Sequence, residues 1–313
     1  MDLRKYNPES VLKPVGFVNL GFTCYYNSLL QALLSCTSFI DELLDNDYEY
    51  SQNKICNIYI KLINDILDDK SESDIARLSP LSWNTIIKEI SDQSPEMAKF
   101  AMGQQCVGEG FSILLQVLEK YQGIQNLFLH RRKNRLYCRN CNTWCSETIE
   151  INNFFSIEPD LELKQLKKFS SYSDPKTKND LNSFLFLQDT FVDKDHICGN
   201  CNYRGEKFKI SQLTMVPEIL FVLSKKYMYE NNKGKKLDVY TDFPKILSFN
   251  SKNNIELTYQ AVSQIEHSGG IDGGHYWTIC KRNDGWYKLN DMSISSSEFK
   301  PTNNTYDVVY HIM

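Results

Sequence analysis

The apolar residues in the first third of the chain recur with the spacing of an α-helix. In the longest stripe, apolar residues fall at positions i, i+3, i+4, i+7, i+8 and i+11, which is typical of the buried face of an amphipathic helix. This stripe comprises Ile55, Ile58, Tyr59, Leu62, Ile63 and Ile66. Shorter stripes of the same kind occur at Tyr26–Leu34 and Phe111–Leu118. We therefore predict that the chain begins with a mostly helical part.

From about residue 135 onward the pattern changes to aromatic and β-branched runs, which are typical of strands. The clearest runs are Ile219–Leu223, Glu256–Ile265, Tyr276–Lys281 and Asp307–Ile312. Asn283-Asp284-Gly285 separates two strand-like runs and predicts a hairpin turn. The polar stretches Lys70–Ser79 and Phe169–Asn182 predict exposed loops, and the short basic run Lys233–Lys236 predicts a solvated hairpin tip. Helices followed by a mainly antiparallel sheet make the predicted fold class α+β.

Composition and charge narrow the class of protein. The chain has 313 residues, 42% of them apolar and 24% charged, which is ordinary for a globular protein. A net charge of −4 argues against a nucleic-acid binder that works through backbone phosphates. No apolar run reaches the roughly 18 residues of a membrane span, and the N-terminus lacks the apolar stretch of a signal peptide. We expect an intracellular protein, in the cytoplasm or nucleus, without membrane or nucleic-acid partners.

Ten cysteines in such a chain favour metal ligands, a nucleophile and core residues over a disulfide framework. Cys36, Cys56 and Cys280 lie on apolar patterns and are expected in the core. Cys138-Arg139-Asn140-Cys141 and Cys198-Gly199-Asn200-Cys201 are two C-x-x-C pairs, the pattern of a tetrahedral zinc ribbon. We predict one structural zinc per chain and no organic cofactor. Cys145 and His196 lie near enough to be rival ligands, although ordinary loop residues are the preferred interpretation.

Cys24 directly follows the turn Asn19–Thr23 and starts a predicted helix. Free amides and the positive dipole end at a helix N-terminus favour a thiolate and can stabilise an oxyanion. Position alone also fits a small buried hydrophobic residue, which is the commonest role of a free cysteine. A thiolate nucleophile further needs a base from elsewhere in the chain.

His275 is the candidate base, because it stands at the start of a strand after a glycine-rich loop. The glycines there permit close approach of backbone or substrate. The amide of Asn290 and the carboxylate of Asp291 follow on the next strand and are suited to orienting an imidazole.

These residues carry a resemblance to a known family. GFVNLGFTCYYNSLLQALL, around Cys24, resembles the cysteine box of the ubiquitin-specific proteases, and GGHYWTICKRNDGWYKLND, around His275, resembles their histidine box. Further motifs agree in order, so that the resemblance covers about residues 15–312. They are Gln104–Glu109, Leu223–Tyr227, His267–Gly269 and Asp307–Ile312.

The resemblance implies a single catalytic domain, 1–313, with the fold of a papain-like hand. In such a hand a helical thumb (about 15–125), β-fingers with a zinc ribbon (126–215) and a β-palm (216–313) surround ubiquitin. It implies a thiol-dependent deubiquitinase that cleaves after the C-terminal glycine of ubiquitin through a thioester. Cys24 would be the nucleophile and His275 the base, with Asn290 as third member, Asp291 assisting it and Asn19 as oxyanion donor. The substrate-tail set would be Gln104, Gln105, Glu109, His267, Gly269, Gly274 and Tyr276.

Departures from the family pattern indicate a compact, divergent member. Phe22 replaces the usual Asn, Cys106 the usual Asp and Gly110 the usual aromatic residue. Ubiquitin and ubiquitinated proteins are the expected partners of a monomer. Two alternatives remain at this point, namely a protease for a ubiquitin-like modifier and a weakly active ubiquitin-binding scaffold.

Overall fold

The computed structural model describes residues 12–93, 105–157, 187–192, 197–205, 207–230, 233–250, 256–270 and 273–313. Gln104, His196 and the predicted loop 169–182 lie outside these residues. Among the described residues, no helix is both long and apolar enough to cross a membrane.

Helices occupy the first part of the chain, as the apolar spacing predicts. They are α1 (Cys24–Leu33), α2 (Thr37–Asp45), α3 (Asp47–Tyr50), α4 (Lys54–Leu67), α5 (Glu72–Ala76), α6 (Leu78–Gln93), α8 (Val107–Val117) and α9 (Gln122–Phe128). The stripe on α4 is buried except at Ile58, which packs against the core while partly exposed. Asn53 caps this helix, because its side chain accepts hydrogen bonds from the N–H groups of Ile55 and Cys56.

The strands form two large sheets and one hairpin. A four-stranded sheet of order β2-β1-β5-β4 contains β1 (His130–Cys138), β2 (Thr143–Asn152), β4 (Leu187–Val192) and β5 (Lys207–Met215). The eight-stranded sheet has the order β13-β12-β11-β10-β14-β6-β3, with β9 also paired to β10. Its strands are β3 (Phe155–Ile157), β6 (Ile219–Ser224), β9 (Ile246–Asn250), β10 (Glu256–Gly269), β11 (Gly274–Arg282), β12 (Gly285–Asn290), β13 (Ser293–Ser297) and β14 (Thr305–Ile312). The hairpin pairs β7 (Tyr227–Glu230) with β8 (Lys233–Lys236).

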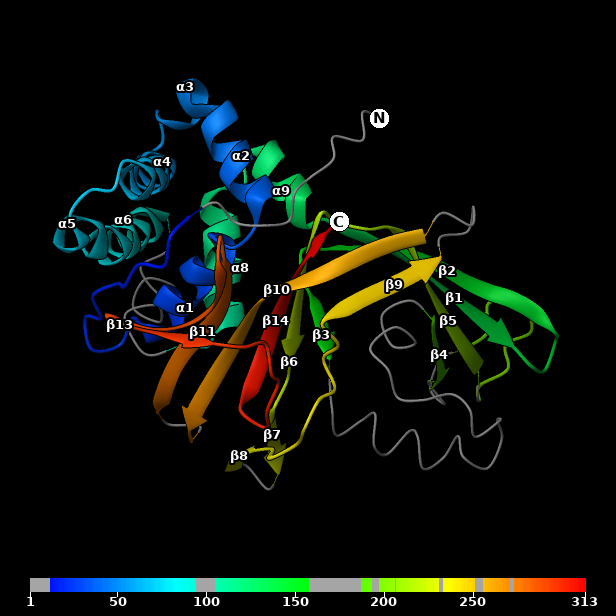
Figure 1. The fold of residues 1–313 in the computed structure, drawn as a ribbon. Coiled ribbons are helices and arrows are strands. Elements are labelled where there is room, and N and C mark those ends of the chain that lie inside the picture. The colour runs from blue at the N-terminus through cyan, green and yellow to red at the C-terminus, as the bar shows by residue number, and fades with distance from the viewer. Residues whose placement is uncertain are drawn as a thin grey trace.

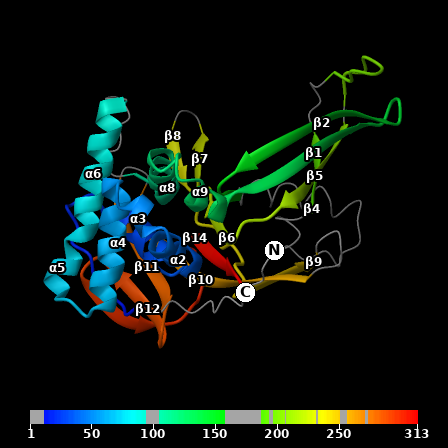
Figure 2. The ribbon, with the colours of Figure 1, turned by 90° about the horizontal axis from the view of Figure 1, so that it is seen from above.

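The two large sheets lie on different sides of the molecule. The helices pack at one end, against the eight-stranded sheet, while β1 and β2 project away from them (Figures 1 and 2). Strand pairing in the eight-stranded sheet is antiparallel except between β3 and β6. This mixed arrangement of helices first and a mainly antiparallel sheet afterwards confirms the predicted fold class.

The core has two parts that lie on opposite faces of the eight-stranded sheet. Along β6, Ile219 and Phe221 join the cluster beneath the helices, whereas Leu220 and Val222 join a smaller cluster on the other face. This alternation follows from the two-residue period of a strand. It explains why the run at 219–223 is apolar throughout rather than alternating.

Two interpretations of polar stretches are corrected by the structure. Residues 70–79 hold α5 and the start of α6 rather than a loop. Ser71 caps α5 by accepting a hydrogen bond from the N–H of Asp74, and Ile75 is buried, so a short capped helix forms despite the polar composition. The sequence Lys233–Lys236 is strand β8 rather than only a solvated hairpin tip, and Lys236 makes specific contacts described below. Cys36, Cys56 and Cys280 are buried, as predicted.

Candidate active site

The turn before α1 is held together by the side chain of Asn19. Its Oδ1 accepts hydrogen bonds from the backbone N–H groups of Gly21 at 2.8 Å and Thr23 at 3.1 Å. Gly21 has φ +98°, a left-handed conformation that favours glycine. The turn therefore delivers Cys24 to the first position of α1 in a fixed geometry.

Cys24 is the first residue of α1 and is almost completely buried. Burial raises the pKa of its thiol above the ordinary value of 9.0. The backbone N–H of Tyr276 opposes this rise, because it forms a hydrogen bond with the sulfur. The nearby negative charge of Asp291 raises the pKa of the thiol further. The residue that bonds the sulfur is the neighbour of His275 in the chain. The structure thus brings together two segments that are 251 positions apart in the sequence.

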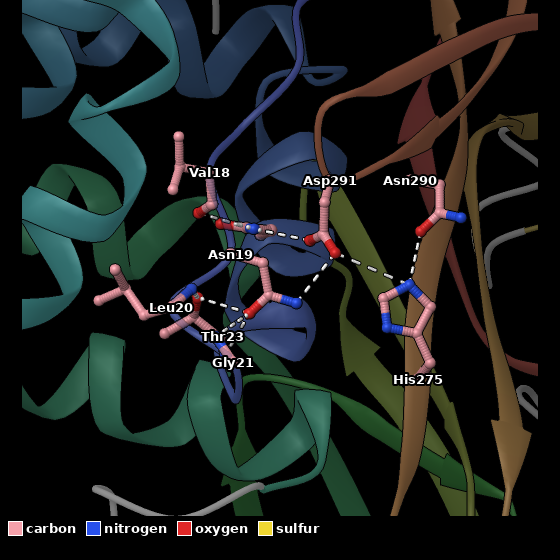
Figure 3. Close-up of polar contacts among 9 residues, drawn as sticks. Val18, Asn19, Leu20, Gly21, Thr23, His275, Asn290 and Asp291 are labelled. Carbon is pink, nitrogen blue, oxygen red and sulfur yellow. Dashed lines mark hydrogen bonds and ion pairs between the residues drawn. The ribbon is translucent and has the colours of Figure 1, made fainter.

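His275 lies at the start of β11, opposite the end of β12. Its Nε2 is 2.5 Å from Asn290 Oδ1 and 3.7 Å from Asp291 Oδ2 (Figure 3). Both neighbours are oxygen acceptors, so Nε2 must carry a hydrogen, and in the neutral ring Nδ1 is then the nitrogen with a lone pair. This tautomer suits a base that removes a proton through Nδ1.

Asp291 connects the cysteine segment to the histidine. Its carboxylate accepts hydrogen bonds from Asn19 Nδ2 at 2.9 Å and from Asn27 Nδ2 at 2.8 Å, and its backbone oxygen accepts one from Phe17 N–H at 2.9 Å. Asp291 has φ +50°, which turns the chain sharply after β12. Figure 3 shows its carboxylate between Asn19 and His275.

The predicted catalytic residues therefore lie together, although their roles stay predictions. An amide nitrogen carries two hydrogens, and the bond from Asn19 to Asp291 uses one of them. The other groups of the site are a thiol at a helix N-terminus and an imidazole whose Nε2 carries the hydrogen. An amide and a carboxylate lie next to that Nε2. This arrangement can support nucleophilic attack by sulfur.

The predicted metal ligands also converge. The sulfur atoms of Cys138, Cys141, Cys198 and Cys201 lie within 4.8 Å of one another. Sγ of Cys138 is 3.8 Å from that of Cys201, and Sγ of Cys141 is 3.7 Å from that of Cys198. Tetrahedral zinc with bonds of about 2.3 Å holds its sulfurs about 3.8 Å apart, so the cluster fits this metal.

Cys145, the rival ligand, is not part of that four-sulfur group, and it lies in strand β2 rather than in a loop as expected. Its Sγ lies 3.5 Å from the backbone oxygen of Leu136, where the thiol can donate a hydrogen bond. The other rival, His196, is outside the described residues. The Nδ2 of Asn140 lies 3.5 Å from Cys201 Sγ, so the first C-x-x-C pair supplies a hydrogen bond to the site as well as two sulfurs.

The described residues expected to bind a substrate tail lie in two places, at the start of α8 and in the strands β10 and β11. Glu109 Oε2 accepts from the N–H of Cys106 at 3.0 Å, and Cys106 Sγ accepts from the N–H of Glu109 at 3.3 Å, which forms a capping box at the start of α8. His267 and Tyr276 are almost completely buried, with ring centroids 4.3 Å apart and ring planes tilted by 38°. Gln105 is half-buried just before α8. The tail-binding role of these residues stays a prediction.

The glycines near His275 serve the close approach of two strands. A Cβ on Gly269 would meet Gly274 Cα at 2.5 Å, and one on Gly274 would meet His267 Nε2 at 2.2 Å. At Gly269 the obstructing atoms belong to the backbone of Gly273 and Gly274, whereas at Gly274 they are the side chain of His267 and the backbone oxygen of Ser268. The two glycines therefore allow the start of β11 to lie tightly against β10.

Two residues with contacts to this region were not singled out in the sequence. Asn27, three positions after Cys24, bonds Asp291 as described above and accepts a hydrogen bond from Ser79 Oγ at 2.7 Å. Lys236 Nζ donates to the backbone oxygens of His267 at 3.2 Å and Gly269 at 3.0 Å. Helical spacing from Cys24 could have pointed to Asn27, but no local signal distinguishes Lys236 from its neighbouring lysines.

Comparison with known proteins identifies the family. The family model described as ubiquitin carboxyl-terminal hydrolase matches residues 15–310. The chain belongs to this family.

Relatives within the ubiquitin carboxyl-terminal hydrolase family are distant in sequence. Ubiquitin carboxyl-terminal hydrolase 26 of Arabidopsis thaliana is 25% identical over 94% of this chain and 27% of that protein. The human ubiquitin carboxyl-terminal hydrolase 2 is 25% identical over 98% of this chain and 56% of that protein. The chain therefore spans between about a quarter and two thirds of the length of the curated relatives it matches.

Solved structures agree with the family assignment at the level of the fold. In the SAGA DUB module of Ubp8, Sgf11, Sus1 and Sgf73 bound to monoubiquitin, the matching chain is 20% identical with a TM-score of 0.74, covering 98% of this chain and 70% of that one. The same module bound to ubiquitin aldehyde gives a TM-score of 0.73 at 19% identity, covering 97% of this chain and 70% of that one. The predicted hand fold of the family is thus confirmed. The expectation of a monomer is not supported, because these structures contain Ubp8 in a multi-subunit module.

Proposed function

We propose that this member of the ubiquitin carboxyl-terminal hydrolase family is a thiol-dependent deubiquitinase. The observation that carries the proposal is the convergence of Cys24, His275, Asn290 and Asp291 from both ends of the chain. Ubiquitin is the proposed partner, in line with the ubiquitin bound in the Ubp8 structures. The proposal also assigns residues 15–125 to a thumb, 126–215 to fingers and 216–313 to a palm around it.

In the first half of the proposed reaction, His275 Nδ1 takes the proton of the Cys24 thiol. The thiolate attacks the carbonyl carbon of the terminal glycine of ubiquitin, and a carbon–sulfur bond forms. Asn19 Nδ2 and the backbone N–H groups at the start of α1 donate to the oxyanion. The imidazolium then returns its proton to the leaving amine as the carbon–nitrogen bond breaks, leaving a thioester.

In the second half, water hydrolyses the thioester with His275 again acting as base. The high pKa of the buried thiol makes this base necessary, because little thiolate forms on its own near neutral pH. Asn290 would hold the imidazole through Nε2, and Asp291 would stabilise the imidazolium with its negative charge.

Zinc has no step in this reaction. Cys138, Cys141, Cys198 and Cys201 would hold one ion at the end of the four-stranded sheet. A thiolate-bound zinc with four protein ligands leaves no open position and contributes to folding rather than chemistry.

The proposal is tested with an electrophilic probe. Ubiquitin with a C-terminal propargylamide should label Cys24 in the native chain and leave Cys24→Ala unlabelled. Cys24→Ala should also abolish cleavage of diubiquitin while it retains ubiquitin binding, measured by calorimetry. Labelling of another cysteine, or turnover by Cys24→Ala above background, would contradict the assignment. Faster labelling by the same probe built on another modifier would instead identify a protease for a ubiquitin-like protein.

A further inference from the structure

The strand that carries His275 contacts the helix that carries Cys24 from Tyr276 to Arg282. Alternate residues of β11 are buried, and they face α1. These residues and their partners on the helix segment form a row of contacts. The residues that β11 contributes to the row are Tyr276, Thr278, Cys280 and Arg282. The helix side is Cys24, Ser28, Gln31 and Ser35.

The spacing of the two elements makes this row possible. Two residues of a strand advance by about 6.6 Å, and three or four residues of a helix advance by about 5 Å. Because these two distances are similar, every second residue of the strand can contact successive turns of the helix over a short distance. Because the row begins at Cys24 and at the neighbour of His275, it fixes the proposed nucleophile and base relative to each other.

The middle of the row consists of two side-chain bonds to backbone oxygens. Thr278 Oγ1 donates to the backbone oxygen of Ser28 at 3.0 Å, in the buried interface. The thiol of Cys280 lies 3.4 Å from the backbone oxygen of Gln31. Both contacts would be lost if β11 moved along α1 by a single residue.

Arg282 closes the row at the end of α1. Its Nη2 donates to the backbone oxygen of Gln31 at 3.1 Å and to Gln31 Oε1 at 2.7 Å, and its Nη1 donates to Ser35 Oγ at 2.5 Å. The N–H of Ser35 bonds the backbone oxygen of Ala32, so the Gln31 oxygen accepts instead from Ser35 Oγ at 3.0 Å, from the Cys280 thiol and from Arg282. A cation is favoured at this end of a helix, where carbonyl oxygens are unpaired.

The side chain of Arg282 is buried, which is unusual for a charged residue. The residue is 1% exposed, the hydrogen bonds described for its Nη1 and Nη2 go to neutral oxygens, and its Nε has no described hydrogen-bond partner. A buried charge without an acidic partner is unfavourable unless its hydrogen bonds are well satisfied. An apolar residue would fill the same space without this penalty, whereas the guanidinium adds hydrogen bonds that join the strand to Gln31 and Ser35.

We propose that Thr278 and Arg282 are positioning residues that set the register of β11 on α1 and thereby the reach of His275 to Cys24. This inference rests on the proposed function, because the register matters only if the two side chains react together. Displacing a reacting group by about 1 Å can lower a rate by about 10²-fold. His275 itself has a side chain 41% exposed, so its place depends on the strand beneath it.

The test compares variants in the row with a matched buried contact outside it. Thr278→Val keeps the shape and removes one hydrogen bond, Arg282→Met removes the charge, and Arg282→Lys restores it. The control is Ser38→Ala, because Ser38 Oγ and His311 Nε2 are 2.7 Å apart in another buried contact, between α2 and β14. Unfolding temperatures are measured for all variants, and kinetics are recorded where each is folded.

Two readouts separate the inference from the proposed function. The first is kcat and KM on a ubiquitin C-terminal fluorogenic amide, and the second is the pH profile of alkylation of Cys24 by chloroacetamide, which needs no ubiquitin. We expect Thr278→Val and Arg282→Met to lower kcat about tenfold or more, with KM nearly unchanged and partial recovery in Arg282→Lys. Their alkylation profiles should move toward that of His275→Ala, while Ser38→Ala loses stability without either change.

The inference is overturned if Thr278→Val has the same kcat and the same alkylation profile as Ser38→Ala. This outcome decides the inference even if Arg282→Met fails to fold. If the native chain does not cleave the ubiquitin amide, the proposed function fails. The alkylation profiles then decide the inference alone, since they report the pairing of Cys24 with His275 directly.

Discussion

Asn19 Nδ2 lies 2.9 Å from Asp291 Oδ2, although 272 positions separate the two residues. Through this bond the turn that precedes the proposed nucleophile is tied to the residue that follows the third member, Asn290. The same Asp291 oxygen is 3.7 Å from His275 Nε2. One carboxylate therefore contacts both the proposed oxyanion donor and the proposed base.

We expect the loss of this carboxylate to impair turnover more than binding. Asp291→Asn removes the charge that stabilises the imidazolium and weakens the hold on Asn19, so kcat should fall by about 10²-fold, the range seen when a preorganised charge or donor is removed. Asn290→Ala should lower kcat less than His275→Ala does. The measurement is steady-state cleavage of a ubiquitin C-terminal fluorogenic amide.

The double variant Asn290→Ala/Asp291→Ala distinguishes the two roles. Groups that serve one imidazole are expected to be non-additive. A silent Asp291→Ala, with the double variant equal to Asn290→Ala, would show that Asp291 has no role. A silent Asn290→Ala with a severe Asp291→Ala would make Asp291 the third member instead.

The sequence predicts the elements of this site better than their connections. Cys24 at a helix start, His275 at a strand start and the paired C-x-x-C motifs follow from local spacing and chemistry. The contacts of Asp291 with Asn19 and Asn27 depend on how a helix and a sheet from opposite ends of the chain pack together, which no local pattern contains. The capping box of Cys106 and Glu109 shows a different limit, because a thiol is not an expected cap and the resemblance assigns Glu109 only to the substrate tail.

The same reasoning applies to the fold. Periodicity predicts α4, and strong strand runs predict β6, β10, β11 and β14. It fails for α5, where one serine cap and two buried residues, Ile75 and Ala76, outweigh a polar composition. Short helices have too few positions to show a period, so tertiary burial decides them.

The buried thiol predicts a specific pH dependence for a variant without the base. Because burial raises the pKa of Cys24 above 9.0, the thiolate fraction in His275→Ala should be small near neutral pH and increase only above that value. Alkylation of Cys24 by chloroacetamide in His275→Ala should therefore be slow at neutral pH and rise steadily in alkaline buffer. The native chain should react faster at neutral pH, because His275 can accept the proton. Equal profiles for the two proteins would contradict a pairing of Cys24 with His275.

Zinc removal should unfold the end of the four-stranded sheet before it changes chemistry at Cys24. Purified protein should contain one zinc per chain, and Cys198→Ser should lose it, since a structural site needs all four thiolates. The matched control is Cys145→Ser, because Cys145 lies beside the cluster but outside it. Elemental analysis and unfolding temperature with and without a chelator provide the measurement. Metal-free native protein, or metal loss in Cys145→Ser but not in Cys198→Ser, would show that the ligand set is wrong.

Lys236 offers a test of how the end of the β10–β11 hairpin affects substrate. Its Nζ bonds the oxygens of His267 and Gly269 and lies 3.3 Å from His267 Nδ1. Burial, followed by the charge of Lys236, lowers the pKa of His267 to about 4, so this imidazole is neutral near pH 7 and can accept a hydrogen bond from the ammonium. One lysine therefore holds both the backbone and the side chain of the segment expected to border the substrate tail.

We expect Lys236→Met to raise KM for the ubiquitin amide several-fold, with a smaller change in kcat, because the segment loses its anchor while His275 keeps its bond to Asn290. Lys235→Met is the matched control, since Lys235 is the adjacent lysine and is exposed. It removes the same charge from the same hairpin, so a general effect of charge on ubiquitin binding should appear in both variants. A KM change of equal size in the two would attribute it to charge alone. An unchanged KM in Lys236→Met would show that the bonds to His267 and Gly269 do not shape the path of the substrate tail.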